Sequence, residues 1–351
     1  MEKYMDAIVK AEAGPGLELR RVPVPVPGPG EVLIKVRKTA ICGTDVHIYN
    51  WDPWATEHIK PPMTIGHEYV GEIAQLGDGV TGLYVGQRVS GEGHITCHHC
   101  RNCHNGNIQW CKDTKSVGVD RDGAFAEYVC IPQENVIIID ENLPEDVVAF
   151  FDAFGNATHT ALMFPLIGED VLITGAGPIG IIAAAVCKHA GARRVVITDI
   201  NDYRLELAHK CGADVVVNTR NNDFGKALVD CFGPDKADVI YDCAGNNITM
   251  DQAIQNARKG STIILVAVFA DLARCDLAKL NDSELDLNTT MMYRHEDYVD
   301  AIRLVGEGKI QLKPLMSKHF AFQDYIKSYE YIDANQETTM KVLIDVDPNN
   351  D

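Results

Sequence analysis

Two short stretches near the N-terminal end carry a thiol, an imidazole and a carboxylate, the side chains that most often bind zinc in proteins. They are Cys42, and His67 followed directly by Glu68. Three protein ligands leave a fourth position open, which a catalytic zinc needs in order to hold a substrate oxygen. Taken alone, Cys42 and His67 are also compatible with an ordinary buried cysteine and a core histidine. Features further along the chain favour the zinc site.

A hydroxyl and a second imidazole follow the cysteine closely, at Thr44 and His47. Side chains of these two types can pass a proton between a reacting group and solvent in short steps. The spacing therefore indicates a proton path beside the zinc site.

Four further cysteines form a C-x2-C-x2-C-x7-C cluster at Cys97, Cys100, Cys103 and Cys111. Four thiolates at such spacing can close a tetrahedral zinc site that has no open position, so the predicted site is structural. Reduced surface cysteines in a polar loop are an alternative, although exposed thiols are easily oxidised. An iron–sulfur cluster is another, because ferredoxin-type sequences also space cysteines by two. The interleaved histidines are expected to face solvent: His98, His99 and His104.

A glycine-rich turn between a predicted strand and a predicted helix indicates a dinucleotide site. The strand is 171–174, the turn carries Gly175, Gly177 and Gly180 in a GxGxxG pattern, and Asp199 ends the next strand, nineteen positions after Gly180. In this context the pattern is typical of a Rossmann domain, whose glycines let a pyrophosphate approach the helix N-terminus. The carboxylate of Asp199 should bind the adenosine ribose hydroxyls and repel a 2′-phosphate, which favours NAD over NADP. A purely structural glycine turn is the alternative.

The composition excludes several classes of protein. The net charge is −18 (32 basic minus 50 acidic residues) without a basic stripe, which argues against nucleic acid or an anionic membrane surface as a partner. No apolar run approaches the roughly 20 residues that span a bilayer, and residues 1–6 lack the order of a signal peptide. The eleven cysteines are an odd count, and five of them occupy metal-like positions. These features predict a cytoplasmic protein with metal ligation instead of a disulfide framework.

The pattern of elements predicts two domains. Residues 1–140 alternate short β-rich runs with glycine and proline turns, which is typical of an irregular β-barrel. From Glu145 onward helical periodicity begins, and strands then alternate with helices, which implies a parallel sheet. Helices are expected at 181–189, near 250–258, at 296–308 and near 322–334, with late strands at 262–268 and 340–346. The terminal strand needs a partner, and we expect it to rejoin the N-terminal β domain.

Catalytic-type zinc ligands, a four-cysteine lobe and a Rossmann fingerprint, in this order, form a set that few families share. The chain resembles the zinc-containing medium-chain alcohol dehydrogenases over nearly its whole length. Within that superfamily its N-terminal half is similar to the L-threonine 3-dehydrogenases. The motifs that carry this similarity are residues 38–52, 66–71, 89–97, 151–160 and 197–208.

The resemblance implies an α/β fold in which a GroES-like irregular β-barrel forms the catalytic domain and a doubly wound Rossmann sheet binds the cofactor. The catalytic domain would span residues 1–156, completed by 297–351, and the NAD-binding domain residues 157–296. The resemblance also implies two zinc ions per chain, one catalytic and one structural, NAD as cofactor, and a homotetramer.

The resemblance further assigns roles to individual residues. Cys42, His67 and Glu68 would hold the catalytic zinc, Thr44 and His47 would relay the proton, and Asp152 would lie beside the metal. His94 falls at the position associated with threonine recognition. The residues expected at the adenosine half of NAD are Ile179, Asp199 and Arg204, and those expected near its nicotinamide half are Val266, Ala267, Val268, Met292 and Tyr293.

The C-terminal third departs from the threonine pattern. Residues 269–288 do not match it, and residues 291–298, with the run to His319, look more like the dehydrogenases of sorbitol or xylitol. The leading hypothesis is NAD-linked, zinc-dependent oxidation of the 3-hydroxyl of L-threonine to 2-amino-3-oxobutanoate. The alternative is a polyol or vicinal-diol dehydrogenase acting on sorbitol, xylitol or butanediol. A non-enzymatic relative with the same fold should have lost zinc ligands or relay residues, and all of these are present.

Overall fold

The computed structural model describes residues 3–269 and 272–347. The chain divides into two compact units, one of Met1–Asp152 with Met316–Asp351 and one of Ala153–Leu315. The sequence placed these boundaries after residues 156 and 296. The second differs because helix α11 (His295–Gly306), expected to complete the first unit, belongs to the second. Residues 270–271 of the divergent 269–288 segment, and the ends of the predicted catalytic domain at 1–2 and 348–351, lie outside the described residues.

The first unit is built from β-sheets, as its alternating sequence predicted. Its largest sheet runs in the order β10-β6-β5-β3-β18-β17, with β9 paired to β3. The strands of this sheet are β3 (Glu31–Ile41), β5 (Glu68–Leu76), β6 (Arg88–Gly91), β9 (Tyr128–Pro132), β10 (Val136–Ile138), β17 (Met316–Ala321) and β18 (Lys341–Asp345). A smaller sheet joins β1 (Tyr4–Lys10), β2 (Glu18–Pro23) and β4 (Met63–Thr64), and β7 (His94–Ile95) pairs with β8 (Lys115–Ser116).

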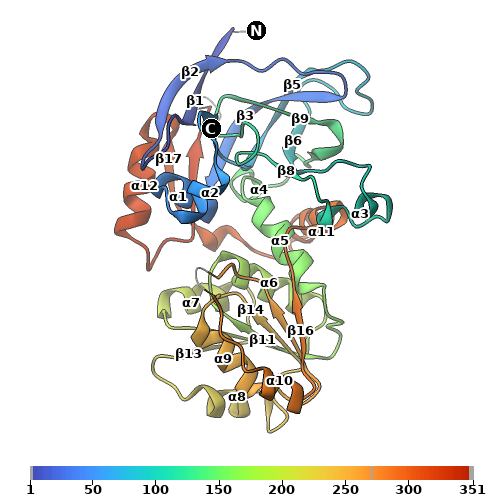
Figure 1. The fold of residues 1–351 in the computed structure, drawn as a ribbon, viewed down its shortest axis with the longest axis vertical. Helices are drawn as coiled ribbons and strands as arrows, with labels where there is room; N and C mark the ends of the chain where they lie inside the picture. The colour runs from blue at the N-terminus through green and yellow to red at the C-terminus, as the bar shows by residue number, and fades with distance from the viewer. Residues whose placement is uncertain (1–2, 270–271, 348–351) are drawn as a thin grey trace. The chain divides into compact units, whose positions relative to one another are not determined.

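The terminal strand rejoins the N-terminal sheet, which confirms the sequence-based expectation. Strand β18 pairs antiparallel with β3, so that Val342 faces Ile41 and Leu343 faces Ala40. In Figure 1 the red end of the chain accordingly lies among the blue strands of the same unit. Because Val342, Leu343 and Ile344 are each at most 1% exposed, burial of apolar surface holds this strand in the sheet.

Short helices and single 3₁₀ turns connect the strands of the first unit. Two of them, α1 (Gly43–Asn50) and α2 (Pro53–His58), follow β3 directly and were not predicted from the sequence. The others are α3 (Arg101–His104), α4 (Glu145–Val148), α12 (Tyr325–Ala334) and the 3₁₀ turns η1 (Ile108–Trp110), η2 (Gln133–Asn135) and η4 (Phe322–Asp324). The predicted helix near 322–334 is therefore η4 followed by α12.

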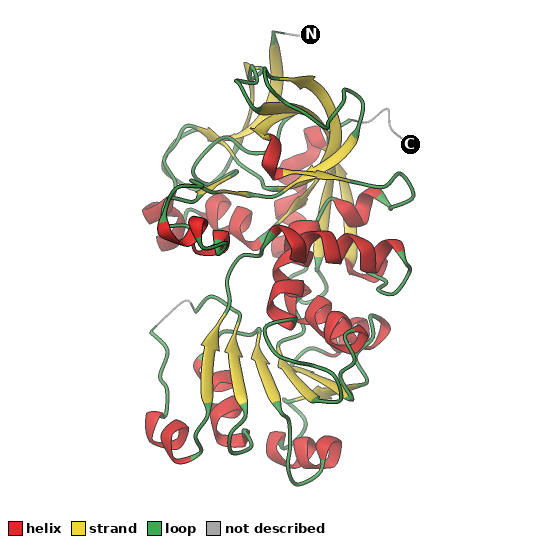
Figure 2. Ribbon diagram, turned by 90° about the vertical axis from the view of Figure 1, so that its right-hand side faces the viewer, coloured by secondary structure: helices red, strands yellow, loops and turns green. Residues whose placement is uncertain are grey.

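The second unit contains one parallel sheet in the order β13-β12-β11-β14-β15-β16. In chain order this is 3-2-1-4-5-6, the arrangement of a doubly wound dinucleotide-binding sheet. Its strands are β11 (Asp170–Thr174), β12 (Arg194–Asp199), β13 (Val215–Asn218), β14 (Val239–Asp242), β15 (Thr262–Leu265) and β16 (Asp286–Thr289). Figure 2 shows these strands side by side with helices around them. The predicted α/β fold class, a β-barrel domain with a Rossmann sheet, is confirmed.

The helices of the second unit are α5 (Phe151–Ala161, which begins in the first unit), α6 (Pro178–His189), α7 (Asp202–Lys210), α8 (Phe224–Phe232), α9 (Asn247–Asn256), α10 (Leu277–Asp282), α11 and the 3₁₀ turn η3 (Lys313–Leu315). Three of them, α6, α9 and α11, agree with the predicted ranges to within a few residues, whereas α7, α8 and α10 had no predicted range. None of the helices in the described part of the chain has the length and apolarity needed to cross a bilayer. All eleven cysteines are free thiols.

One predicted strand is shorter than expected, and one strand was not predicted. Strand β15 ends at Leu265, so residues 266–268 belong to the following loop. Strand β16 pairs with β15 on its far side and forms the edge of the sheet. Every residue of β16 is exposed, and its sequence Asp-Leu-Asn-Thr lacks the apolar run of a buried strand. The edge of the sheet therefore lies at β16, beyond the predicted late strand.

Candidate active site and metal centres

The predicted catalytic zinc ligands lie together in the first unit. Cys42 follows the last residue of β3, and Glu68 opens β5, where it pairs with Ala40. A donor atom from each of Cys42, His67 and Glu68 lies within 4.8 Å of the other two. The register of two neighbouring strands thus brings a thiol, an imidazole and a carboxylate to one point, and these donors fit a divalent zinc ion.

A lysine that the sequence did not indicate holds the carboxylate of this cluster. Nζ of Lys341 lies 2.6 and 2.7 Å from the two carboxylate oxygens of Glu68. Both side chains are buried, at 4% and 0% exposure. Lys341 opens β18, one residue before the pair of Val342 and Ile41, so the terminal strand places it opposite Cys42. Each carboxylate oxygen has two lone pairs, so these hydrogen bonds leave Glu68 able to bind a metal.

Negative groups surround the imidazole of His67. Burial alone would lower the pKa of His67, but the Cys42 thiol and the carboxylates of Asp45 and Asp152 raise it well above its usual value. Burial raises the pKa of Asp45 to about 6, although His67 and the Cys42 amide oppose the shift. Nδ1 of His67 and Oδ1 of Asp45 are buried without a hydrogen-bond partner among the described residues. A cation at this point would satisfy the excess of acceptors.

The two predicted relay residues lie on helix α1, three positions apart and therefore on one face. The hydroxyl oxygen of Thr44 lies 4.0 Å from Sγ of Cys42. His47 is exposed, and its Nδ1 hydrogen-bonds to Oδ2 of Asp52. The structure thus places Thr44 beside Cys42 of the predicted zinc site. His47 lies on the same face of the helix, one turn farther on, and is exposed to solvent.

Asp152 and His94 also lie near this cluster. Oδ1 of Asp152 is 3.4 Å, and Cβ of His67 3.8 Å, from the point where a side chain on Gly93 would begin. Burial lowers the pKa of His94, while the charges of Asp152 and Glu92 act in the opposite direction. Asp152, predicted to lie beside the metal, and His94, predicted to contact the substrate, therefore both lie close to His67.

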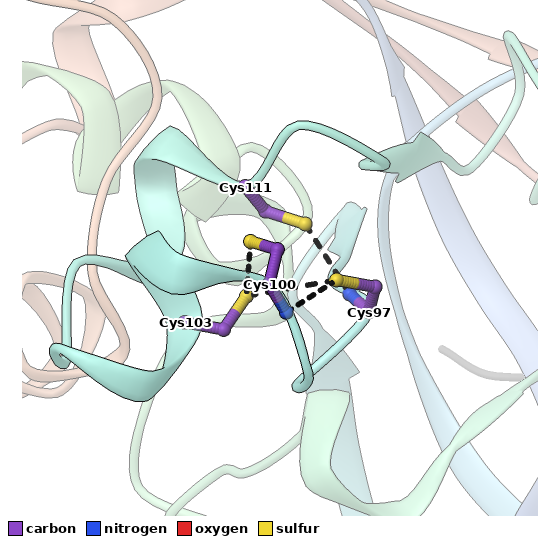
Figure 3. Close-up of side chains that lie close together, drawn as sticks. All are labelled: Cys97, Cys100, Cys103 and Cys111. Carbon is purple, nitrogen blue, oxygen red and sulfur yellow. Dashed lines mark hydrogen bonds between the residues drawn. The ribbon is translucent and has the colours of Figure 1, made fainter.

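The four-cysteine lobe has the geometry of a closed tetrahedral site. Its sulfur atoms converge from the loop after β7, from the start and body of helix α3 and from the residue that follows η1, as Figure 3 shows. The Cys100 and Cys103 sulfurs are 3.6 Å apart, and those of Cys97 and Cys103 are 4.0 Å apart. Four sulfurs bound to zinc at about 2.3 Å would be separated by about 3.8 Å. The lobe therefore fits a zinc ion without rearrangement.

Backbone amides donate hydrogen bonds to the sulfur atoms of the lobe, which favours the thiolate form of its cysteines. Amide groups donate to Sγ of Cys97 and to Sγ of Cys111 at 3.3 Å. Backbone hydrogen bonds from Cys103 and Lys112 lower the pKa of Cys100 to about 6. Burial and the neighbouring sulfurs raise the pKa of Cys103 to about 12, as expected when thiols crowd together without a cation. As predicted, the three histidines of the lobe are exposed: His98, His99 and His104.

Each glycine of the glycine-rich turn in the second unit meets a different structural requirement. Gly175 adopts φ +93°, and Gly180 leaves no room for a side chain because its Cβ would lie 2.0 Å from the Gly175 carbonyl oxygen. Gly177, the N-cap of α6, has nothing within 4 Å of its would-be Cβ. The turn is thus tight at its ends and open at its middle, where a pyrophosphate can approach the helix N-terminus.

Asp199 lies beside this turn at the end of β12. Its Oδ2 accepts a hydrogen bond from the Ala176 amide at 2.7 Å, and its Oδ1 accepts from the amides of Ile200 and Asn201. Arg204 is in the first turn of α7, and Ile179 is partly exposed in the first turn of α6. These residues occupy the positions expected for the adenosine side of a dinucleotide.

The loops expected at the nicotinamide side differ in accessibility. The Val266 and Ala267 amides donate to the Asp242 carbonyl at 3.0 and 3.1 Å, which fixes this loop beside the end of β14. Val268 is 88% exposed. Met292 is partly exposed, whereas Tyr293 is fully buried against Tyr298, with its ring also close to Gly155. Tyr293 therefore offers no accessible surface to a ligand.

Comparison with known proteins agrees with this arrangement. Residues 28–141 match the alcohol dehydrogenase GroES-like domain, and residues 178–307 match the zinc-binding dehydrogenase domain. The L-threonine 3-dehydrogenase of Burkholderia mallei (strain SAVP1) is 44% identical over 343 residues, which cover 97% of this chain and 99% of that protein.

Two solved structures from Escherichia coli show the same fold. An alcohol dehydrogenase from strain CFT073, solved with NADH, has a TM-score of 0.91 at 27% identity and covers 98% of this chain and 100% of that one. Galactitol-1-phosphate dehydrogenase has a TM-score of 0.88 at 25% identity, covering 97% and 100%.

The chain belongs to the zinc-binding alcohol dehydrogenases. This dehydrogenase is therefore an oxidoreductase that acts on a small-molecule alcohol. Its predicted catalytic ligands, relay residues and cysteine lobe come together in one unit, and its predicted dinucleotide motif in the other. Sequence reasoning gave no role to Lys341, which belongs to no motif, or to Asp52, which ends the 38–52 motif without a chemical pattern of its own. Only the register of β18, and the turn between α1 and α2, bring them to the site.

The buried pair predicts how this dehydrogenase responds to loss of Lys341. The Lys341→Met variant should lose about 3–5 kcal/mol in its free energy of unfolding, because the Glu68 carboxylate is left buried and unpaired. Urea unfolding monitored by tryptophan fluorescence would measure this loss. Removing both charges in Glu68→Gln/Lys341→Met should restore a large part of the stability, since no unpaired charge remains. Equal midpoints for the wild type and Lys341→Met would show that the pair is not formed.

Proposed function

We propose that this dehydrogenase oxidises the 3-hydroxyl of L-threonine with NAD, giving 2-amino-3-oxobutanoate, NADH and a proton. The observation that carries the proposal is the 44% identity, over 97% of the chain, to proteins named L-threonine 3-dehydrogenase. Identity at this level over almost the whole chain supports a shared substrate, whereas the shared fold alone would leave the substrate open.

Cys42, His67 and Glu68 would hold the catalytic zinc, with Lys341 orienting the Glu68 carboxylate through two hydrogen bonds. Bound there, zinc supplies a Lewis acid that lowers the pKa of the substrate alcohol. Asp152 adds a carboxylate beside His67, and its negative charge supports the imidazole that faces the metal. Cys97, Cys100, Cys103 and Cys111 would hold the structural zinc.

The proton of the substrate hydroxyl leaves along helix α1. Oγ1 of Thr44 receives it and passes on its own proton to Nε2 of His47, because Nδ1 of His47 is already hydrogen-bonded to Asp52. His47 is 56% exposed, so the proton then reaches solvent from its ring. The hydride from C3 goes to the nicotinamide ring, which balances the two-electron oxidation.

NAD is the proposed cofactor because Asp199 ends β12 beside the glycine-rich turn. A carboxylate at this position accepts hydrogen bonds from the ribose hydroxyls and repels a 2′-phosphate. Gly177 leaves the space at the N-terminus of α6 into which the pyrophosphate fits.

The decisive experiment measures NADH and NADPH formation with L-threonine, sorbitol, xylitol and 2,3-butanediol in parallel. L-Threonine with NAD should give the highest kcat/KM. His94→Ala should lower kcat/KM for threonine by roughly 10- to 100-fold, the effect of losing a hydrogen bond to a charged substrate group. Activity on 2,3-butanediol, which lacks that group, should fall much less.

An exposed histidine on α6 offers a matched control, since His189→Ala should leave all of these activities unchanged. If threonine and diol activities fell equally in His94→Ala, His94 would not contribute to the recognition of threonine. If a polyol were oxidised and threonine were not, the second candidate would be correct. The polyol-like C-terminal third and the structural similarity to galactitol-1-phosphate dehydrogenase favour that candidate.

The two metal sites predict different responses to chelation. Active protein should contain two zinc ions per chain by elemental analysis. A chelator should first remove the ion held by three residues, together with the activity, because its coordination is open, whereas the four-thiolate ion should stay. Cys103→Ser should lose the second ion selectively. One zinc or none in active protein would refute the two-site proposal, and iron with visible absorbance would indicate a cluster.

We also propose a homotetramer assembled through the cofactor-binding units. The exposed edge strand β16 offers unpaired backbone groups on one side, to which a second copy can add its own strand. Light scattering at micromolar concentration should therefore give about four times the 38.6 kDa chain mass. A mass near that of one chain would refute assembly.

A further inference from the structure

Asp52 makes two separate contacts with its two carboxylate oxygens. Oδ1 accepts a hydrogen bond from the Ala55 amide at 3.0 Å, which caps the N-terminus of α2. Oδ2 hydrogen-bonds to Nδ1 of His47, five residues earlier on α1. A helix cap needs only one of these oxygens, and serine would serve equally well. The second contact is therefore not explained by capping.

The turn between α1 and α2 is arranged so that Asp52 returns to His47. Trp51 adopts a left-handed conformation, with φ 55° and ψ 47°, at the C-terminus of α1. Such a conformation is unfavourable for a residue other than glycine and persists where its surroundings hold it. The ammonium group of the buried Lys10 lies 4.7 Å from the Trp51 ring centroid, and the Asp52 amide donates to the His47 carbonyl. The position of Asp52 is thus fixed from several sides.

The contact decides which ring nitrogen of His47 can accept a proton. A neutral imidazole carries one N–H group, and the other nitrogen holds the lone pair. A carboxylate can only accept, so Asp52 requires the proton to be on Nδ1 and leaves the lone pair on Nε2. Partial burial opposes ionisation of Asp52, but the Ala55 amide and the His47 ring lower its pKa, so it is a carboxylate at neutral pH.

We infer that Asp52 is a positioning residue that fixes His47 in the tautomer able to take the substrate proton at Nε2. The inference rests on the proposed function, in which His47 receives the proton from Thr44. Asp52 itself does not touch the substrate. Its role corresponds to that of the aspartate in a Ser-His-Asp triad, which sets the tautomer and orientation of the histidine.

Two variants separate this role from helix capping. In Asp52→Ser the hydroxyl still caps α2, but the contact with His47 is lost, so both tautomers should be populated. In Asp52→Asn the amide oxygen caps α2 and the NH₂ group faces His47. The NH₂ group donates to Nδ1, so the ring is held with its proton on Nε2, where it cannot accept another. We therefore expect the more conservative substitution to be the more harmful one.

The test combines kinetics with ¹⁵N-histidine NMR of the full-length, zinc-loaded protein. Asp52→Asn should lower kcat by roughly 100-fold or more, within the range of general acid–base catalysis. Asp52→Ser should lower kcat only about tenfold, and KM values for NAD and substrate should change little in either variant. His47 resonances, assigned with His47→Gln, should report a proton on Nδ1 in the wild type and on Nε2 in Asp52→Asn.

The background variant His47→Gln completes the experiment. Adding Asp52→Asn to it should cause no further loss of kcat, because no ring remains to be oriented. If Asp52→Asn were milder than Asp52→Ser, or were equally harmful in both backgrounds, Asp52 would act as a cap alone. A wild-type His47 with its proton on Nε2 would also overturn the inference. If no substrate were turned over, the proposed function would fail, and the NMR measurement would still decide the tautomer.

Discussion

The buried ion pair between Glu68 and Lys341 is the interaction on which the candidate active site depends. Removing two charges from water costs several kcal/mol each, and this cost is recovered only when the partners meet at close range with their hydrogen bonds satisfied. Here both oxygens of Glu68 are contacted, at 2.6 and 2.7 Å. The pair joins β5, which presents Glu68 beside His67, to the terminal strand β18. The zinc ligands from the first quarter of the chain are therefore held by its last strand.

Features encoded by neighbouring residues could be predicted from the sequence. The spacing of the four cysteines fixes a lobe because sulfur atoms a few residues apart in one loop can converge without help from the rest of the chain. The glycine-rich turn is similar, since Gly175 needs its positive φ and Gly180 its missing side chain for local reasons. The parallel sheet followed from strands that alternate with helices. In each case a short segment contains the physical cause.

Features that arise from distant contacts could not be predicted. Lys341 is an unremarkable lysine until β18 pairs with β3 and places it opposite Cys42. Strand β16 is exposed along its whole length, so no apolar periodicity marks it. Helix α1 has no apolar stripe, and its N-cap is Cys42, whose amide donates to the buried carboxylate of Asp45. The second domain boundary shifted because α11 packs within the second unit, through contacts that include the buried pair of His159 and Asp297.

The charges around His67 explain why this cluster suits a metal. The Cys42 thiol and the carboxylates of Asp45, Glu68 and Asp152 lie within electrostatic reach of Lys341 or His67. Their field raises the pKa of His67 despite its burial, which means that this ring binds a proton tightly when no other cation is present. A dication bound there would compete with a proton for the lone pair of the ring, so zinc binding and protonation of His67 oppose each other. The negative charge that raises the pKa of His67 would thus also favour a zinc ion, whereas the relay proposed above uses His47, farther along α1 beside Asp52.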